Sequence, residues 1–149
     1  MRVSIRRAES VTLATHREAI RRARLGPLLR RSGDALGIAP RSSLSVRLTG
    51  DEELRALNHR FLGSDTPTDV LAFPADDRDV VGDIAISVER ALEQVDGDGG
   101  AAELRLLAVH GLLHCLGHDH HSREQAAAMT RATRELLPEQ PVPDLVPVV

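Results

Sequence analysis

Residues 101–116 constrain the fold of this chain more than any other segment. The segment predicts the strongest helix in the sequence, and a helix that is apolar nearly all round has to be buried. Its large apolar side chains are Leu106, Val109, Leu112, Leu113 and Leu116. The sequence contains two Phe and neither Tyr nor Trp, so the core is expected to consist of Leu, Val, Ile and Ala.

The rest of the sequence predicts helices that alternate with short strands, followed by a helical final third. Strands are expected at 2–6, 43–48, 68–73 and 82–87. Further helices are expected at about 15–31, 51–61, 88–95 and 122–137. This order predicts an α/β or α+β sandwich around a small mixed sheet, and we expect one domain over residues 1–149.

Several helix and strand ends carry their own signals. Gly26-Pro27 is expected to kink or divide the helix at 15–31. Thr49 or Asp51 is expected to cap the helix at 51–61, and Ser122 the last helix. The strand at 68–73 is expected to close at Pro74, with an acidic loop after it, and the Pro-rich C-terminal tail to be irregular.

Composition and charge limit the function classes. The single cysteine, Cys115, cannot form an intramolecular disulfide, and no signal peptide or membrane span is expected, so we predict a cytoplasmic protein. The net charge of −3 disfavours a nucleic-acid binder. However, residues 1–60 carry 13 Arg and 6 acidic residues, whereas residues 61–149 carry 6 Arg and 16 acidic residues. This split indicates either a polyanion-binding face or simply solvated helix surfaces.

Five of the seven histidines lie within residues 110–121. His110 and His114 are four residues apart, which puts both imidazoles on one helix face, one turn from each other. Gly117 is the kind of residue that ends a helix and lets the chain turn back. The third ligand is then His118, His120 or His121, and the room to turn after Gly117 modestly favours His120.

Three neutral imidazoles with an open fourth position are typical of a catalytic zinc site. Such a site lowers the pKa of bound water to about 7. Metalloproteases with an HExxH helix place a glutamate directly after the first histidine, whereas this chain has Gly111, which disfavours peptide hydrolysis. Cys115, a possible soft ligand, is expected to face the core as a small apolar residue.

Three segments together resemble one known family. They are HGLLHCLGHDH (110–120), LNHRFLGSDTPTDVLAFP (57–74) and GDIAISVERA (82–91). The chain thereby resembles the YbeY family of bacterial rRNA maturation factors, described as metal-dependent endoribonucleases. The resemblance implies an α+β fold in which a mixed four-stranded sheet packs with helices and a zincin-like helix carries the metal ligands. These ligands would be His110, His114 and His120, with solvent in the fourth place.

The resemblance also implies a role and partners. The role is single-strand-specific cleavage in 3′-end maturation of small-subunit rRNA and in ribosome quality control. The partners are rRNA and the small ribosomal subunit, one of its platform proteins, and a ribosome-assembly GTPase. One zinc ion is the expected cofactor, although imidazole ligands also suit nickel and other divalent transition metals.

Two positions depart from the family pattern. His118 stands where the family usually has Tyr, and we interpret it as a surface residue in preference to a proton shuttle. Leu62 stands where the family has an arginine believed important for activity. Arg60 is the nearest substitute and our candidate catalytic side chain, although two residues on a helix point about 200° apart. A non-catalytic assembly factor with a structural metal is therefore the alternative function.

Some polar residues allow two interpretations. Thr68 and Asp69 are expected either to line a groove beside the metal or to form a polar strand entry. Asp83 and Asp119 are each candidates for orienting a ligand histidine by a hydrogen bond. Asp119 is equally well placed to form a turn.

Overall fold

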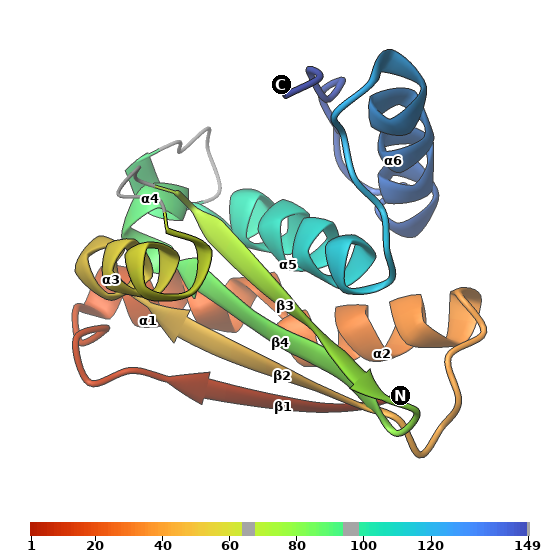
Figure 1. Ribbon diagram of the computed structural model, residues 1–149. Helices are drawn as coiled ribbons and strands as arrows, with labels where there is room; N and C mark the ends of the chain where they lie inside the picture. Colours follow the sequence, from red (N-terminus) through yellow and green to blue (C-terminus); the bar gives the residue numbers. More distant parts are fainter. Residues whose placement is uncertain (64–67, 94–98, 149) are drawn as a thin grey trace.

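A four-stranded mixed sheet forms the base of the molecule. The computed structural model describes residues 1–63, 68–93 and 99–148. The strands are β1 (Arg2–Arg7), β2 (Ser43–Thr49), β3 (Val70–Asp77) and β4 (Val80–Ser87). Their spatial order is β1-β2-β4-β3, in which β2 is parallel to β1 and β4, and only β3 is antiparallel (Figure 1). The predicted single α+β domain with a mixed sheet is confirmed.

Six helices are described. They are α1 (Ala14–Ala23), α2 (Leu25–Ala35), α3 (Asp51–Leu62), α4 (Val88–Glu93), α5 (Ala101–Cys115) and α6 (Arg123–Leu136). Helix α5 packs on β3 and β4 and also contacts α1, α2, α4 and α6. Figure 1 shows α6 and the C-terminal end on the outer side of α5, away from β1 and β2. None of the helices in the described ranges is long and apolar enough to cross a membrane.

The central place of α5 agrees with its apolar sequence. Leu104, Ala108, Val109, Leu112 and Leu113 are fully buried in it, although Leu116, just after its end, is 41% exposed and does not belong to the core. The close contact between α5 and the sheet is made at Gly111. A Cβ atom at this position would lie 2.7 Å from Cγ2 of Ile84 on β4, so only glycine allows the helix to approach this strand so closely.

The other face of the sheet carries less cover. Leu71 and Ala85 point to this face and pack with Leu54 of α3 in a small second core. Next to α3 the sheet is open, and a hollow of about 490 Å³ lies there. It is lined by strand side chains that include Ser4, Arg6, Ser45, Arg47 and Asp83, with Leu57, Phe61 and Phe73 beside them.

The first predicted helix is divided, but not at Gly26-Pro27. The break is at Arg24, which has a left-handed conformation with φ of 49° and connects α1 to α2. Pro27 lies in the first turn of α2, where backbone N–H groups have no partner within the helix and proline is tolerated.

One of the two predicted helix caps is present, and one strand runs further than predicted. Ser122 caps α6 in a full capping box with Gln125, as predicted. The predicted cap of α3 was wrong: the N-cap is Gly50, and the Glu89 carboxylate accepts the Asp51 N–H at 3.0 Å. Strand β3 does not close at Pro74 but continues to Asp77, because proline is tolerated on an edge strand.

Candidate metal centre

Helix α5 holds two imidazoles one turn apart. The Nε2 atoms of His110 and His114 are 2.9 Å apart, and their ring centroids are separated by 4.5 Å. Two nitrogen lone pairs this close repel each other unless a proton or a cation lies between them. Since α5 is packed against the sheet and four other helices, the pair sits on a rigid element, as a working site requires.

The third imidazole comes from the loop after α5. Gly117, with φ of 97°, adopts the left-handed conformation that ends the helix, and the chain then returns over the same face. The His120 ring centroid lies 5.4 Å from those of both His110 and His114. One ligand atom of each of these three residues lies within 4.8 Å of the others. Among the alternatives left by spacing, the geometry thus brings His120 to the pair.

The three side chains suit a transition-metal ion of the zinc type. Burial, followed by the neighbouring His114 and His120, lowers the pKa of His110 to about 3. Burial also lowers the pKa of His114. Both rings are therefore held in the neutral form that ligates metal. The Nδ1 atom of His120 is buried without a hydrogen-bond partner in the described part of the chain. Three imidazole nitrogens suit zinc, nickel or copper and do not identify which is bound.

A hollow of about 380 Å³ adjoins His114. It is lined by residues of the β3 edge and the loop after α5, and also by Leu62 and His118. His118 is half-buried there, beside His114. Arg60 does not line this hollow: its guanidinium carbon lies 5.1 Å from the centroid of the Phe61 ring. Leu62, not Arg60, therefore takes the position beside the histidines.

The two acidic candidates, Asp83 and Asp119, lie in different parts of the molecule. Asp83 lines the hollow on the open face of the sheet, whereas its neighbour Ile84 faces α5, so Asp83 points away from the histidines. Asp119 holds the loop after α5: its Oδ1 accepts the His120 N–H at 2.8 Å, and its Oδ2 lies 2.9 Å from Nε2 of His121.

Each of the two interpretations of Thr68 and Asp69 applies to one of these residues. The Thr68 hydroxyl donates to the Val70 carbonyl at 3.1 Å, which makes it a local polar cap. Asp69 lines a hollow of about 260 Å³ together with Glu103 and His110. Burial raises the pKa of both carboxyl groups. Residues Thr66 and Pro67 of the same motif lie outside the described residues.

Cys115 is not among the three residues grouped around the site. It is half-buried and packs against the main core, as expected of a small apolar residue. Burial raises the pKa of its thiol to about 11, so it stays protonated and is a poor ligand at neutral pH.

The C-terminal residues that contribute to this region are not predicted by the sequence. Val142, Pro143, Asp144 and Leu145 line the same hollow as His110. The chain carries no local signal for this, because the contact joins residues more than thirty positions apart in a segment without regular secondary structure.

Comparison with known proteins agrees with this geometry. The family model described as endoribonuclease YbeY matches residues 9–140. The chain belongs to the YbeY family. An endoribonuclease YbeY from a Chelativorans species is 45% identical over 105 residues, which are 64% of this chain and 64% of that protein. One from Bacillus velezensis is 37% identical over 127 residues, 75% of this chain and 81% of that protein.

A solved structure supports the fold. The solution structure of a protein from Thermotoga maritima is similar with a TM-score of 0.50 and 26% identity, over 92% of this chain and 90% of that one. Membership of the YbeY family confirms the expected enzyme class, a metal-dependent hydrolase of the endoribonuclease type.

Proposed function

We propose that this chain is a single-strand-specific, metal-dependent endoribonuclease that acts in 3′-end maturation of small-subunit rRNA and in ribosome quality control. The observation that carries the proposal is the convergence of His110, His114 and His120 beside a hollow. Proteins from Chelativorans and Bacillus velezensis that are named endoribonuclease YbeY give it independent support.

The three histidines are the proposed ligands of one zinc ion, or of nickel or another divalent transition metal. When bound, such an ion supplies Lewis-acid activation of water and of a phosphoryl oxygen. His110 and His114 hold the ion from a rigid helix, and their lowered pKa values keep both rings neutral at the pH of the cell. The hollow beside His114 leaves room for a phosphodiester to approach.

Arg60 remains the candidate catalytic side chain, because the position of the family arginine is occupied by Leu62. A guanidinium group stabilises the charge that develops on a phosphoryl group in the transition state. Arg60 is exposed at the end of α3, whereas Leu62 lines the hollow. If Arg60 acts in cleavage, Arg60→Ala lowers the cleavage rate without changing the metal content.

The partners follow from the family. We expect rRNA and the small ribosomal subunit as the substrate, and a platform protein of that subunit and a ribosome-assembly GTPase as protein partners, in the cytoplasm. The Arg-rich segment 1–60 is consistent with contacts to a phosphate backbone. The scarcity of aromatic residues leaves charge and shape, not base stacking, as the means of RNA recognition.

The direct test compares metal-loaded wild type and His114→Ala on a small-subunit rRNA fragment with an unprocessed 3′ end, and maps the cuts. We expect cutting by the wild type and by His59→Ala, a control for an exposed histidine outside the site, and none by His114→Ala. An uncut fragment in the presence of wild type with stoichiometric metal would refute cleavage of free rRNA.

The substitution at Leu62 favours one alternative, a non-catalytic assembly factor whose metal stabilises the fold. The His114→Ala variant separates the two functions. If His114→Ala folds and binds the small subunit but fails in rRNA maturation, the alternative is excluded. If the folded His114→Ala variant still supports rRNA maturation, the enzymatic function is excluded.

A further inference from the structure

The C-terminal tail, residues 142–148, crosses the molecule beside α6 without forming a helix or strand. It is nevertheless well attached: Val142 and Leu145 are partly buried and pack against the main core. The family match ends at residue 140, just before this segment. The tail is therefore an element whose role the family comparison leaves unassigned.

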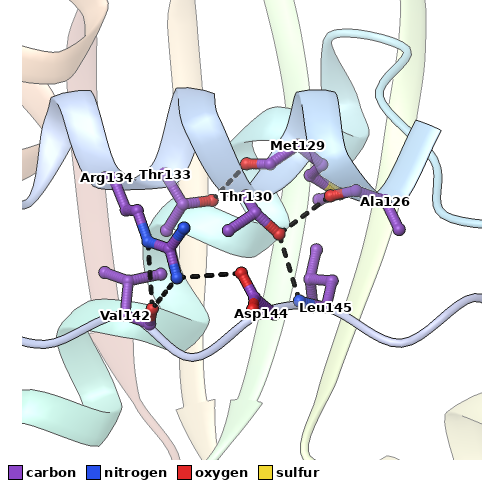
Figure 2. Close-up of polar contacts among 8 residues, drawn as sticks. All are labelled: Ala126, Met129, Thr130, Thr133, Arg134, Val142, Asp144 and Leu145. Atoms are coloured by element: carbon purple, nitrogen blue, oxygen red, sulfur yellow. Dashed lines mark hydrogen bonds and ion pairs between the residues drawn. The ribbon is translucent and has the colours of Figure 1, made fainter. Parts of the chain in front are cut away.

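Two residues of α6 hold the first half of the tail (Figure 2). Arg134 donates to the Val142 carbonyl from Nε at 3.1 Å and from Nη2 at 2.7 Å, and it pairs with Asp144 at 2.9 Å. The buried Thr130 hydroxyl accepts the Leu145 N–H at 3.0 Å while donating to the Ala126 carbonyl at 2.8 Å. These contacts fix the path of the tail along the helix.

The far end of the tail reaches the loop that carries the third histidine. The Val148 N–H donates to the carbonyl of His120 at 2.8 Å. In return, the ring of His121 donates from Nδ1 to the Val148 carbonyl at 2.8 Å. On the other side Asp119 accepts the His120 N–H. The backbone of His120 is thus held from both sides, by its own loop and by the tail.

We propose that the tail is a positioning strap that holds His120 at the metal centre; this rests on the proposed function of the three histidines. His110 and His114 are fixed by a buried helix, but His120 lies on a loop whose place depends on its contacts. A ligand has to be held within about 0.5 Å of its productive position. Residues Val142–Leu145 also line the hollow beside His110, so the strap encloses that side of the site.

The test measures Zn²⁺ affinity of the metal-free full chain, of a chain ending at Pro141, and of Arg134→Gln, by competition with a chromogenic chelator. Loss of contacts that orient ligands typically lowers metal affinity about 10–100-fold, which is the effect expected for the truncated chain. We expect a smaller loss for Arg134→Gln. Arg131→Gln, which changes an exposed arginine on the same helix, should bind Zn²⁺ like the wild type.

Two further readouts separate positioning from general destabilisation. The absorption spectrum of bound Co²⁺ reports ligand geometry and should change in the truncated chain and in Arg134→Gln but not in Arg131→Gln. The thermal midpoints of the metal-free proteins show whether each variant folds. Should the truncated chain fail to fold, Arg134→Gln decides the question.

The outcomes for the strap and for the metal site are distinct. Zn²⁺ binding by the wild type, with equal affinity and an equal Co²⁺ spectrum in Arg134→Gln and in a folded truncated chain, would overturn the strap and leave the three-histidine site intact. A wild type that binds no Zn²⁺ would contradict both the strap and the proposed metal site.

Discussion

Leu62 stands beside His114 in the hollow where the YbeY resemblance expects an arginine. Its side chain is 58% exposed, so a charged group can replace it without leaving the core unfilled. Arg60 does not line the same hollow, and two residues on a helix point about 200° apart. The hollow is therefore open to the addition of the missing guanidinium.

At this position we predict that Leu62→Arg raises the rate of RNA cleavage about tenfold or more, because a guanidinium aimed at the phosphoryl group stabilises its transition-state charge. The measurement is the single-turnover rate on a single-stranded rRNA fragment. Leu62→Gln is the matched polar control and should leave the rate near that of the wild type. Equal rates for the two variants would show that the charge at this site has no effect.

At the scale of elements, the contact between α5 and β4 depends on Gly111. A Cβ atom there would meet the branched side chain of Ile84, which has little freedom to move away. We predict that Gly111→Ala lowers the free energy of unfolding by about 1–2 kcal/mol, since overpacking outweighs the gain of about 1 kcal/mol in helix propensity.

Urea unfolding of the metal-free protein measures this effect. Gly26→Ala is the control, because a Cβ atom at Gly26 would meet only the flexible end of Arg30, at 3.3 Å. We expect this control to be neutral or slightly stabilising. If Gly111→Ala were as stable as Gly26→Ala, the close approach of α5 to β4 would not explain why position 111 is a glycine.

Most elements were predictable because their patterns are local. The apolar sequence of α5 predicted its burial, and Ser122 predicted the start of α6. The errors came from tertiary context. The edge position of β3 lets it continue through Pro74, and a carboxylate from a distant helix, Glu89, takes the place of a local cap for α3. Neither effect is visible in the neighbouring sequence.

At the scale of the whole molecule, part of the site was predictable from the sequence, and part depended on tertiary contacts. The His110 and His114 pair followed from helical spacing, and the family pattern pointed to His120. The placement of Asp83 on the opposite face depended on strand register, which the sequence leaves open. The contact of Val148 with His120 joins distant parts of the chain and has no counterpart in any local pattern.

Burial of His110 also makes the stability of the metal-free protein depend on pH. Its pKa is lowered from 6.5 to about 3 in the folded chain. Below pH 6.5 the unfolded chain takes up a proton that the folded chain does not, so stability is fully present above this pH and falls as the pH approaches 3. We predict that His110→Gln reduces the loss of unfolding free energy between pH 7 and pH 5 by about 1–2 kcal/mol.

Urea unfolding at the two pH values measures this difference, and the carboxylates common to both proteins cancel. An equal pH dependence in wild type and His110→Gln would mean that the ring of His110 is free to accept a proton in the folded state.

In the function we propose, His110, His114 and His120 bind one metal ion on which RNA cleavage depends. The most direct measurement is a titration of metal-free protein with Zn²⁺ while the cleavage of a single-stranded rRNA fragment is recorded. We predict no cleavage without metal, a linear rise with added Zn²⁺, and a break at one ion per chain. Cleavage by the metal-free protein, or a rate that does not change as Zn²⁺ is added, would show that cleavage does not depend on this metal site.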